Sequence, residues 1–297
     1  VWTLDTWGEN LIGVNATDQV IVEWGLDTSN RAEAISGAPE ALAILATEER
    51  SVLALGADGD PRAVAWCDLE DNTDWTPSGT NQAGDDRLQT NGRLMCGKRI
   101  RGGSLIFTDV DVHFAEYVGL PQVYRFSRLA TGCGVASRQA VAVVDGRAFW
   151  WGPNGFWVYD GAVQPLNCDV SDFVLRDLNE TQAPKLYAVH VSQFGEVWWF
   201  YPSTGSVECD RYVVFDYRDG HWNIGSLART CGTDKSVFAY PLMVGTDGQV
   251  YDHEVGNLRD GRQPYAETGP TEIGNGERTM LVRSIIPDEE VLGDVAV

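Results

Sequence analysis

Apolar and β-branched residues recur along this chain in short runs, and polar turns bound each run. Such runs are typical of β-strands, because branched and aromatic side chains pack well on a pleated surface. The clearest predicted strands are residues 41–46, 51–55, 63–67, 104–108, 140–144, 147–151, 186–191, 196–201, 211–216 and 236–244.

Tight turns separate many of these runs. Asp-Gly or Asn-Gly dipeptides begin at Asp58, Asp145, Asn154, Asp219 and Asp247. These dipeptides supply the positive φ angles that short hairpins require. Helical periodicity is found only over residues 31–36 and 170–179. Many short strands joined by hairpins, with almost no helix between them, predict an antiparallel all-β fold.

A repeat refines this prediction. Each copy has an apolar strand, a turn and a second strand, and the copies begin at Leu11, Leu53, Leu105, Phe149, Val197 and Leu242. Their equivalent positions are Gly13, Gly56, Thr108, Gly152, Pro202 and Gly245, at steps of 43, 52, 44, 50 and 43 residues. A period of about 40–50 residues with roughly four strands per unit is typical of a β-propeller.

We therefore expect residues 1–256 to form a β-propeller of about six blades. Because the copies are divergent, five or seven blades are also compatible with the repeat. Residues 257–297 differ in character, since they are rich in Gly and Pro and then contain a strand-like run over 279–286. This pattern predicts an exit segment followed by the first strand of a further, truncated β-rich element.

The composition agrees with a large packed core. Of the 297 residues, 43% are hydrophobic, and the chain contains 11 Trp, 10 Tyr and 10 Phe. A single blade cannot bury both of its faces, so we expect Trp150, Trp151, Trp198 and Trp199 to fill the layers between blades. The sequence has no run of eighteen apolar residues, so it predicts no transmembrane helix and no membrane partner.

The charge balance is strongly acidic. Asp and Glu number 43 against 22 Lys and Arg, which gives a formal net charge of −21. A field of that sign repels phosphates, so a conventional nucleic-acid-binding module is excluded. The six cysteines form no CxxC pair, and a chain of this length does not need disulfides. Buried free thiols are therefore expected, with one or two disulfides as the alternative.

One segment matches the spacing of a phosphate-binding loop. Gly92 to Lys98 reads GxxxxGK, but Arg99 stands where a metal-ligating Ser or Thr would be, and no helix is predicted to follow. The segment is better interpreted as a basic edge strand, KRIRGG, in an otherwise acidic chain. We expect its cations to form surface salt bridges with an acidic neighbour, within the chain or across a subunit boundary.

The remaining polar clusters do not match catalytic or metal-binding patterns. Carboxylates gather at residues 58–60, 68–71, 85–86 and 109–111, but none of these clusters has the spacing of a calcium loop. The four histidines are far apart, and no GxSxG motif is present. We predict no enzyme active site, no metal and no cofactor. A glycosidase-type carboxylate pair stays open, because sequence alone does not place two carboxylates across a cleft.

Eight segments carry a resemblance to a known family, and they run in order along nearly the whole chain. They are TLDTWGENLIG from Thr3, GKRIRGGSLIFTDVDVH from Gly97, TGCGVASRQAV from Thr131, WGPNGFWVYDG from Trp151, PLNCDVSDFVLRDLN from Pro165, FGEVWWFYPS from Phe194, DRYVVFDYRDGHWNIGSL from Asp210 and VGTDGQVYDHEVG from Val244. Together they resemble the tail hub, nozzle or packaged-DNA stabilisation proteins of short-tailed bacteriophages.

The resemblance implies a structural function in the virion. Such proteins form a ring, usually a homohexamer, below the portal and adaptor rings of the head–tail connector, where they retain the packaged DNA and form the channel for its ejection. The implied partners are further copies of the chain, adaptor or head-completion proteins, other tail proteins, and double-stranded DNA that passes without specific binding. The family usually has sequence before the TLDTW segment and a β-rich part after the GDV segment.

On this interpretation, an acidic channel wall repels the duplex over a Debye length of about 8 Å at physiological salt. The residues expected at subunit contacts are Lys98, Arg99 and Arg101, and those expected to line the channel are Asp58, Asp60, Asp85 and Asp86. Two other interpretations stay open: a propeller that binds or cleaves glycans, and a propeller scaffold for protein–protein contacts.

Overall fold

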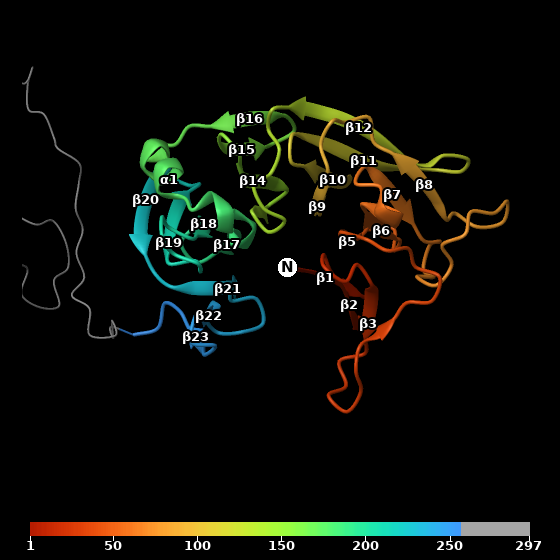
Figure 1. Cartoon of the computed structure of the whole chain (residues 1–297), viewed down its shortest axis with the longest axis horizontal. Helices are drawn as coiled ribbons and strands as arrows, with labels where there is room; N and C mark the ends of the chain where they lie inside the picture. Colours follow the sequence, from red (N-terminus) through yellow and green to blue (C-terminus); the bar gives the residue numbers. More distant parts are fainter. Residues whose placement is uncertain (257–297) are drawn as a thin grey trace, which may run out of the picture. The chain divides into compact units, whose positions relative to one another are not determined.

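The computed structural model describes residues 1–256, whose strands form six antiparallel sheets around a common axis (Figure 1). Five sheets have four strands each, and the last has three. Each sheet uses consecutive strands, and the first strand of each sheet lies nearest the axis. The fold is therefore a six-bladed β-propeller, as the repeat predicted, and the blades are numbered 1 to 6 in chain order. The predicted exit segment and strand beyond residue 256 lie outside the described residues.

The strands of each blade follow one another along the chain. Blade 1 has β1 (Trp2–Trp7), β2 (Asn10–Asn15), β3 (Ile21–Trp24) and β4 (Glu33–Ala34). Blade 2 has β5 (Ala43–Ala46), β6 (Val52–Leu55), β7 (Ala63–Trp66) and β8 (Gly84–Arg87). Blade 3 has β9 (Leu94–Ile100), β10 (Gly103–Thr108), β11 (Asp111–Gly119) and β12 (Val123–Thr131).

The second half of the propeller continues the same order. Blade 4 has β13 (Val141–Val144), β14 (Arg147–Gly152), β15 (Gly155–Tyr159) and β16 (Val163–Leu166). Blade 5 has β17 (Tyr187–Val191), β18 (Glu196–Tyr201), β19 (Arg211–Asp216) and β20 (His221–Ser226). Blade 6 has β21 (Arg229–Thr233), β22 (Leu242–Gly245) and β23 (Val250–Asp252).

The repeat in the sequence is the hairpin between the second and third strands of each blade. These hairpins are β2–β3, β6–β7, β10–β11, β14–β15, β18–β19 and β22–β23. The six positions taken as equivalent all lie within about two residues of the end of the second strand. The repeat was detectable because the second strand of this hairpin is buried or half-buried along its whole length in each blade, and burial restricts its residues more than it restricts the outer strands.

Helices are confined to the connections. The short helices are η1 (Ala57–Gly59), α1 (Ser171–Asp177) and η2 (Glu180–Lys185). Helix α1 confirms the prediction over 170–179. The helix predicted over 31–36 is wrong, because residues 33–34 pair with β3 as the outer strand of blade 1. The strand predicted over 236–244 begins only at Leu242. Among residues 1–256, no helix is both long enough and apolar enough to cross a membrane.

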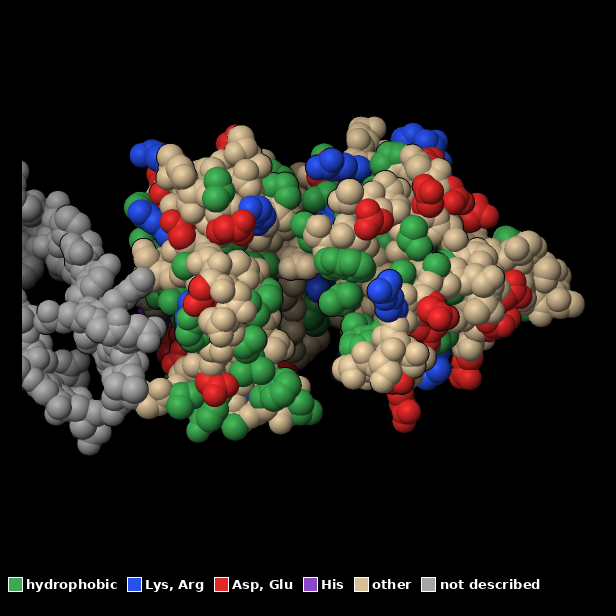
Figure 2. Space-filling model, turned by 60° about the horizontal axis from the view of Figure 1, so that its bottom comes forward, with side chains coloured by type: hydrophobic (Ala, Val, Ile, Leu, Met, Phe, Trp, Pro, Cys, Tyr) green, Lys and Arg blue, Asp and Glu red, His purple; other side chains and the backbone are tan. Residues whose placement is uncertain are grey.

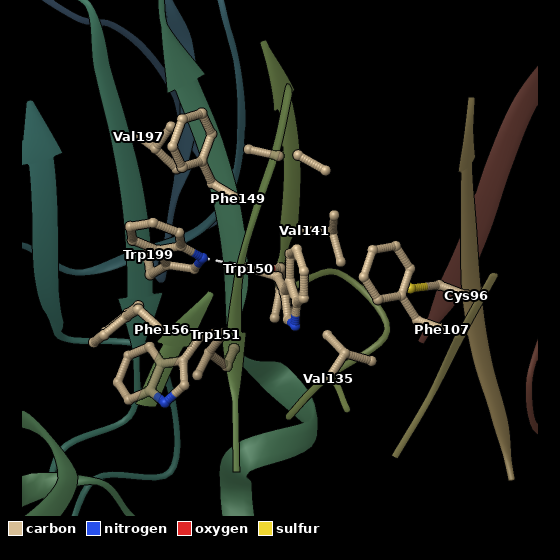
Figure 3. Close-up of a cluster of buried hydrophobic side chains, with 14 of the residues drawn as sticks. Cys96, Phe107, Val135, Val141, Phe149, Trp150, Trp151, Phe156, Val197 and Trp199 are labelled. Atoms are coloured by element: carbon tan, nitrogen blue, oxygen red, sulfur yellow. Dashed lines mark hydrogen bonds between the residues drawn. The ribbon is translucent and has the colours of Figure 1, made fainter. Parts of the chain in front are cut away.

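Aromatic side chains fill the layers between blades, as predicted from the sequence. Figure 3 shows Trp150 of blade 4 between Phe107 of blade 3 and Trp199 of blade 5. The ring centroids of Phe107 and Trp150 lie 5.2 Å apart in an edge-on arrangement. Trp150 and Trp199 are fully buried, and so is Trp151, whereas Trp198 is half-buried. Each of these large rings removes apolar area from water at a junction that neither blade could cover alone.

The indole N–H groups of this layer are also bonded. Trp150 Nε1 donates to the carbonyl oxygen of Cys133 at 2.8 Å. Trp199 Nε1 donates to the carbonyl oxygen of Ala140 at 3.0 Å. Both acceptors lie in the segment that leads into β13 of blade 4. The tryptophans therefore hold this segment in place as well as fill the space between blades.

One junction differs from the other five. Buried apolar clusters join blade 1 to 2, 2 to 3, 3 to 4, 4 to 5 and 5 to 6. Within residues 1–256, no such cluster joins blade 6 to blade 1, and Trp2 and Leu4 on β1 are 48% and 57% exposed. On the facing blade, Val250 is 64% exposed. Figure 2 shows a hollow at this junction with hydrophobic side chains beside it, and we call it the open seam.

We predict that Trp150→Phe lowers the free energy of unfolding by about 2–4 kcal/mol. The substitution leaves a void beside Phe107 and removes the donor to the Cys133 carbonyl. The measurement is urea unfolding followed by circular dichroism. The matched control is Trp2→Phe at the open seam, where a change of under about 0.5 kcal/mol is expected. Equal effects of the two substitutions would contradict the assignment of the core to the layers between blades.

Candidate functional site

The blade topology defines two faces of the propeller. Strands alternate in direction, so the ends of the innermost strands lie on one face together with the first-to-second and third-to-fourth hairpins. We call this the strand-end face. The opposite, strand-start face carries the beginnings of the innermost strands and the second-to-third hairpins. Polar side chains on these faces and on the outer rim are the candidates for function, because the layers between are filled.

A hydrogen bond crosses the propeller axis at the strand-start face. Gln139, just before β13 of blade 4, donates from Nε2 to the carbonyl oxygen of Trp2 in blade 1 at 2.8 Å. Blades 1 and 4 are diametrically opposite in a ring of six, so this hydrogen bond spans the axis. The major groove of a DNA duplex alone is about 12 Å wide, so no duplex passes along the axis of one subunit.

The basic segment lies in the innermost strand β9 and in the turn that follows it. Arg99 Nη2 lies 2.8 Å from Asp5 Oδ1 of β1, and its Nη1 donates to the carbonyl of Ala46 at 2.9 Å. Asp5 Oδ2 also accepts the backbone N–H of Ala46 at 2.9 Å. The expected salt bridge with an acidic neighbour is thus found within the chain, where Arg99 links blade 3 to blades 1 and 2. Lys98 is half-buried, and Arg101 is exposed at the strand-end face.

The four acids expected to line a channel all lie in blade 2. Asp58 is in the connection between β6 and β7, on the strand-start face. Asp60 lies beside it, where its Oδ2 is 2.6 Å from Arg87 Nε. Hydrogen bonds from the Arg62 backbone N–H and from Arg87 lower the pKa of Asp60. The exposed Asp85 and Asp86 lie on the outermost strand β8. The fold therefore places Asp58 and Asp60 in the connection between the second and third strands and Asp85 and Asp86 on the outermost strand, and none of the four lies on the innermost strand β5.

Two hollows lie near the rim. One of about 480 Å³ is bounded by β8 and by the tip of the β11–β12 hairpin, with Trp66, Leu120 and Tyr124 among its lining residues. The other, of about 530 Å³, lies at the outer part of blade 1 beside Glu23 and Arg31. In the first, Trp66 and Tyr124 are almost completely buried, so neither offers the flat exposed ring that a sugar stacks against. In the second, both carboxylate oxygens of Glu23 accept from asparagine side chains.

The most buried polar cluster surrounds Asp111 at the start of β11. Thr90 Oγ1 lies 2.9 Å from both carboxylate oxygens, and Thr108 Oγ1 donates to Oδ1 at 2.5 Å. His113 Nε2 lies 3.2 Å from the same oxygen. The side chains of Asp111 and His113 are each only 3% exposed. This cluster holds the β10–β11 hairpin together, and its burial leaves no route for a substrate.

Burial lowers the pKa of His113, although the carboxylate of Asp111 acts in the opposite direction. Arg128, which faces His113 across the β11–β12 pair, also lowers this pKa. Desolvation prevails because the ring is enclosed, so the folded protein favours the neutral imidazole. Asp60, Asp68 and Asp71 each accept a hydrogen bond from a backbone N–H one or two residues further on, as is usual in turns, and Asp109 accepts from the backbone N–H of Arg93.

A second cluster joins blades 4, 5 and 6 at the strand-end face. His190 Nε2 lies 3.0 Å from the Tyr217 hydroxyl, and its Nδ1 lies 3.8 Å from Asp234 Oδ2. The guanidinium of Arg147 lies 5.3 Å from the centre of the Tyr217 ring. Burial lowers the pKa of His190. These residues line neither of the two hollows described above, so their contacts link three blades and do not border a hollow.

The described residues form no cluster suited to a metal ion, and burial keeps several of the thiols protonated. Among residues 1–256, no group of three or more His, Cys, Asp and Glu side chains could hold a metal ion. All six cysteines are unpaired, as expected, although Cys231 is exposed. Burial raises the pKa of the Cys67, Cys96 and Cys133 thiols to about 11, so these thiols stay protonated near neutral pH.

Sequence reasoning missed the contacts that depend on distant segments. Nothing local marked Gln139 as the partner of Trp2, since 137 residues separate them. The Asp111 cluster had a usable signal, because Thr108, Asp111 and His113 alternate around one tight hairpin. Thr90, the fourth member, comes from an earlier connection and gave no signal.

Comparison with known proteins gives likeness of fold only. No family model matches the chain, and no curated protein matches it. A solved AfRom2 CNH domain has 14% identity and a TM-score of 0.49, covering 87% of this chain and 82% of that chain. A luciferin-regenerating enzyme has 10% identity and a TM-score of 0.49, covering 86% of each chain. The calcium-binding protein regucalcin from Agrobacterium tumefaciens has 11% identity and a TM-score of 0.47, covering 78% and 75%.

We predict that stability falls as the pH drops below about 6.5, the ordinary pKa of histidine, and that His113 contributes to this fall. Its folded-state pKa is lowered, so near that pH the unfolded chain binds a proton that the folded chain does not. The expected result is a shallower loss of stability between neutral and mildly acidic pH in His113→Gln than in the natural chain. Urea unfolding at several pH values measures the slope. His221→Gln, at an exposed position of β20, is the matched control and should leave the slope unchanged. An unchanged slope in His113→Gln would refute the assignment.

Proposed function

We propose that this chain is a structural subunit of a short-tailed bacteriophage tail, in the hub or nozzle ring, and that it has no enzymatic activity. The observation that carries the proposal is the ordered series of family-like segments from Thr3 to Gly256. These segments fall in blades 1, 3, 4, 5 and 6 and in the entries to blades 4 and 5. A resemblance spread over most of the propeller is more specific than any single strand–turn–strand motif.

The hydrogen bond across the propeller axis supports a channel that is formed between subunits. Because Gln139 and Trp2 meet across the axis, a passage for DNA has to be formed between several subunits and not through one propeller. The formal charge of −21 supports a wall that does not retain DNA, since acidic groups repel phosphates at short range. Asp85 and Asp86 on the rim of blade 2 are placed to contribute to such a wall if that rim faces the lumen.

The absence of an organised reaction site among residues 1–256 also favours a structural role. The buried Asp111 cluster is closed to solvent, and the His190 contacts bridge blades. The resemblance also implies that adaptor proteins and other tail proteins are the partners of this chain and that it is located in the virion.

The test is particle mass and shape for the full-length chain, measured by mass photometry and negative-stain microscopy. We expect a ring of about six subunits with a central hole. Fluorescence anisotropy with a short DNA duplex should show no binding even at low salt, where electrostatic attraction would be strongest. A monomer that binds oligosaccharides saturably on a glycan array would refute the proposal and favour a glycan-binding propeller.

A further inference from the structure

Blade 6 lacks the outermost strand that the other five blades have within the described residues. The backbone of β23 therefore has a free edge in residues 1–256. Gly245 N donates to Gln249 O at 2.9 Å, and His253 N donates to Pro241 O at 2.8 Å. Because the pairing alternates in an antiparallel ladder, Val250 and Asp252 direct their backbone N–H and C=O groups away from β22. These two residues offer hydrogen-bonding groups to an added strand.

The strand β12 is the longest of the outermost strands. It has nine residues, whereas β4, β8, β16 and β20 have two, four, four and six. It pairs only with β11, so its other edge is open. Exposed edges of this length pair readily with other strands unless they are covered or charged. β16 contains Pro165, β4 and β8 are short, and β20 is three residues shorter than β12, so β12 offers the longest edge for pairing with another chain.

Charge decides which edges can pair. β12 carries Arg125 and Arg128, whose side chains are exposed. Arg125 is already paired with Glu116 of β11, so Arg128 is the cation that β12 offers to another strand. The β23 segment carries the exposed Asp252 and Glu254. Two β12 edges would repel each other, and so would two β23 edges, whereas β12 against β23 brings opposite charges together. The charges therefore favour a contact in which the β12 edge of one copy meets the β23 edge of another copy.

These two edges lie on opposite sides of the propeller (Figure 1). Blades 3 and 6 are diametrically opposed in a ring of six blades, so one copy can receive a strand on one side and donate a strand on the other. A contact of this head-to-tail kind generates a closed ring when the rotation between copies closes. The added strand would also cover Val250, which is 64% exposed beside the open seam.

We propose that β12 of one copy of this chain pairs with β23 of the next copy and supplies the fourth strand of blade 6. Backbone hydrogen bonds to Val250 and Asp252 give the contact its strength, and the pairing of Arg128 with Asp252 or Glu254 sets its polarity. This inference rests on the proposed ring-forming function and names the surface through which the ring assembles.

The experiment measures the oligomeric state of the full-length chain by mass photometry. Val250→Pro removes an outward N–H from β23 and leaves the hydrogen bonds to β22 intact, so the ring should be lost. Val250→Ala keeps that N–H and is the matched control, which should assemble normally. Circular dichroism and thermal unfolding establish that both variants are folded.

A charge exchange tests the same contact without a proline. Arg128→Asp and Asp252→Arg should each weaken the ring, and the double variant should restore it. Asp85→Arg combined with Arg128→Asp is the control for the other acidic edge, β8, and should not restore assembly.

The outcomes separate the two claims. Rings that persist in Val250→Pro and in both charge variants would overturn the interface and leave the proposed function standing. Rescue by Asp85→Arg instead of Asp252→Arg would move the acceptor edge to β8 and overturn the assignment to blade 6. If the natural chain stays monomeric at its highest soluble concentration, the proposed interface is wrong. If that monomer also binds a DNA duplex or a glycan, the proposed function is wrong as well.

Discussion

Each blade of this propeller has two apolar faces, and only a neighbouring blade can cover them. Trp150 is the clearest case, since it packs on Phe107 of blade 3 while Trp199 approaches the same blade from the other side. The stability of every blade therefore depends on its neighbours, and a buried ring at one junction contributes to the order of three sheets.

The polar contacts of the interior follow from the same packing. Close approach of blades leaves little room between connections: a Cβ added at Gly134, which leads into blade 4, would lie 2.1 Å from the carbonyl carbon of Asp109 in blade 3. Where such connections bring polar groups together, they must bond to one another. Asp111 meets that requirement within blade 3 and the connection that leads into it, and Asp5 with Arg99 meets it between blades 1 and 3. The function of the molecule is thereby confined to its faces, its rim and its strand edges.

The part of the candidate surface that could be predicted was the part encoded locally. The basic character of Lys98, Arg99 and Arg101 and the acidity of Asp85 and Asp86 are plain in the sequence, and so was the expectation of a salt bridge to the basic strand. The identity of the acidic partner was not, because Asp5 lies 94 residues from Arg99 along the chain. The location of the acids was not predictable either, since a repeat in sequence does not say which strand of a blade faces outward.

The all-β class, the six repeats and the aromatic residues between blades could be inferred from the sequence, because hairpin turns and alternating burial act on neighbouring residues. Three features became known only from the folded chain: Gln139 contacts Trp2 across the axis, Asp85 and Asp86 lie on the outermost strand of blade 2, and blade 6 has three described strands. These features depend on residues far apart along the chain. Local propensities select strands and turns residue by residue, whereas the closure of a ring depends on how small twists accumulate over all six sheets.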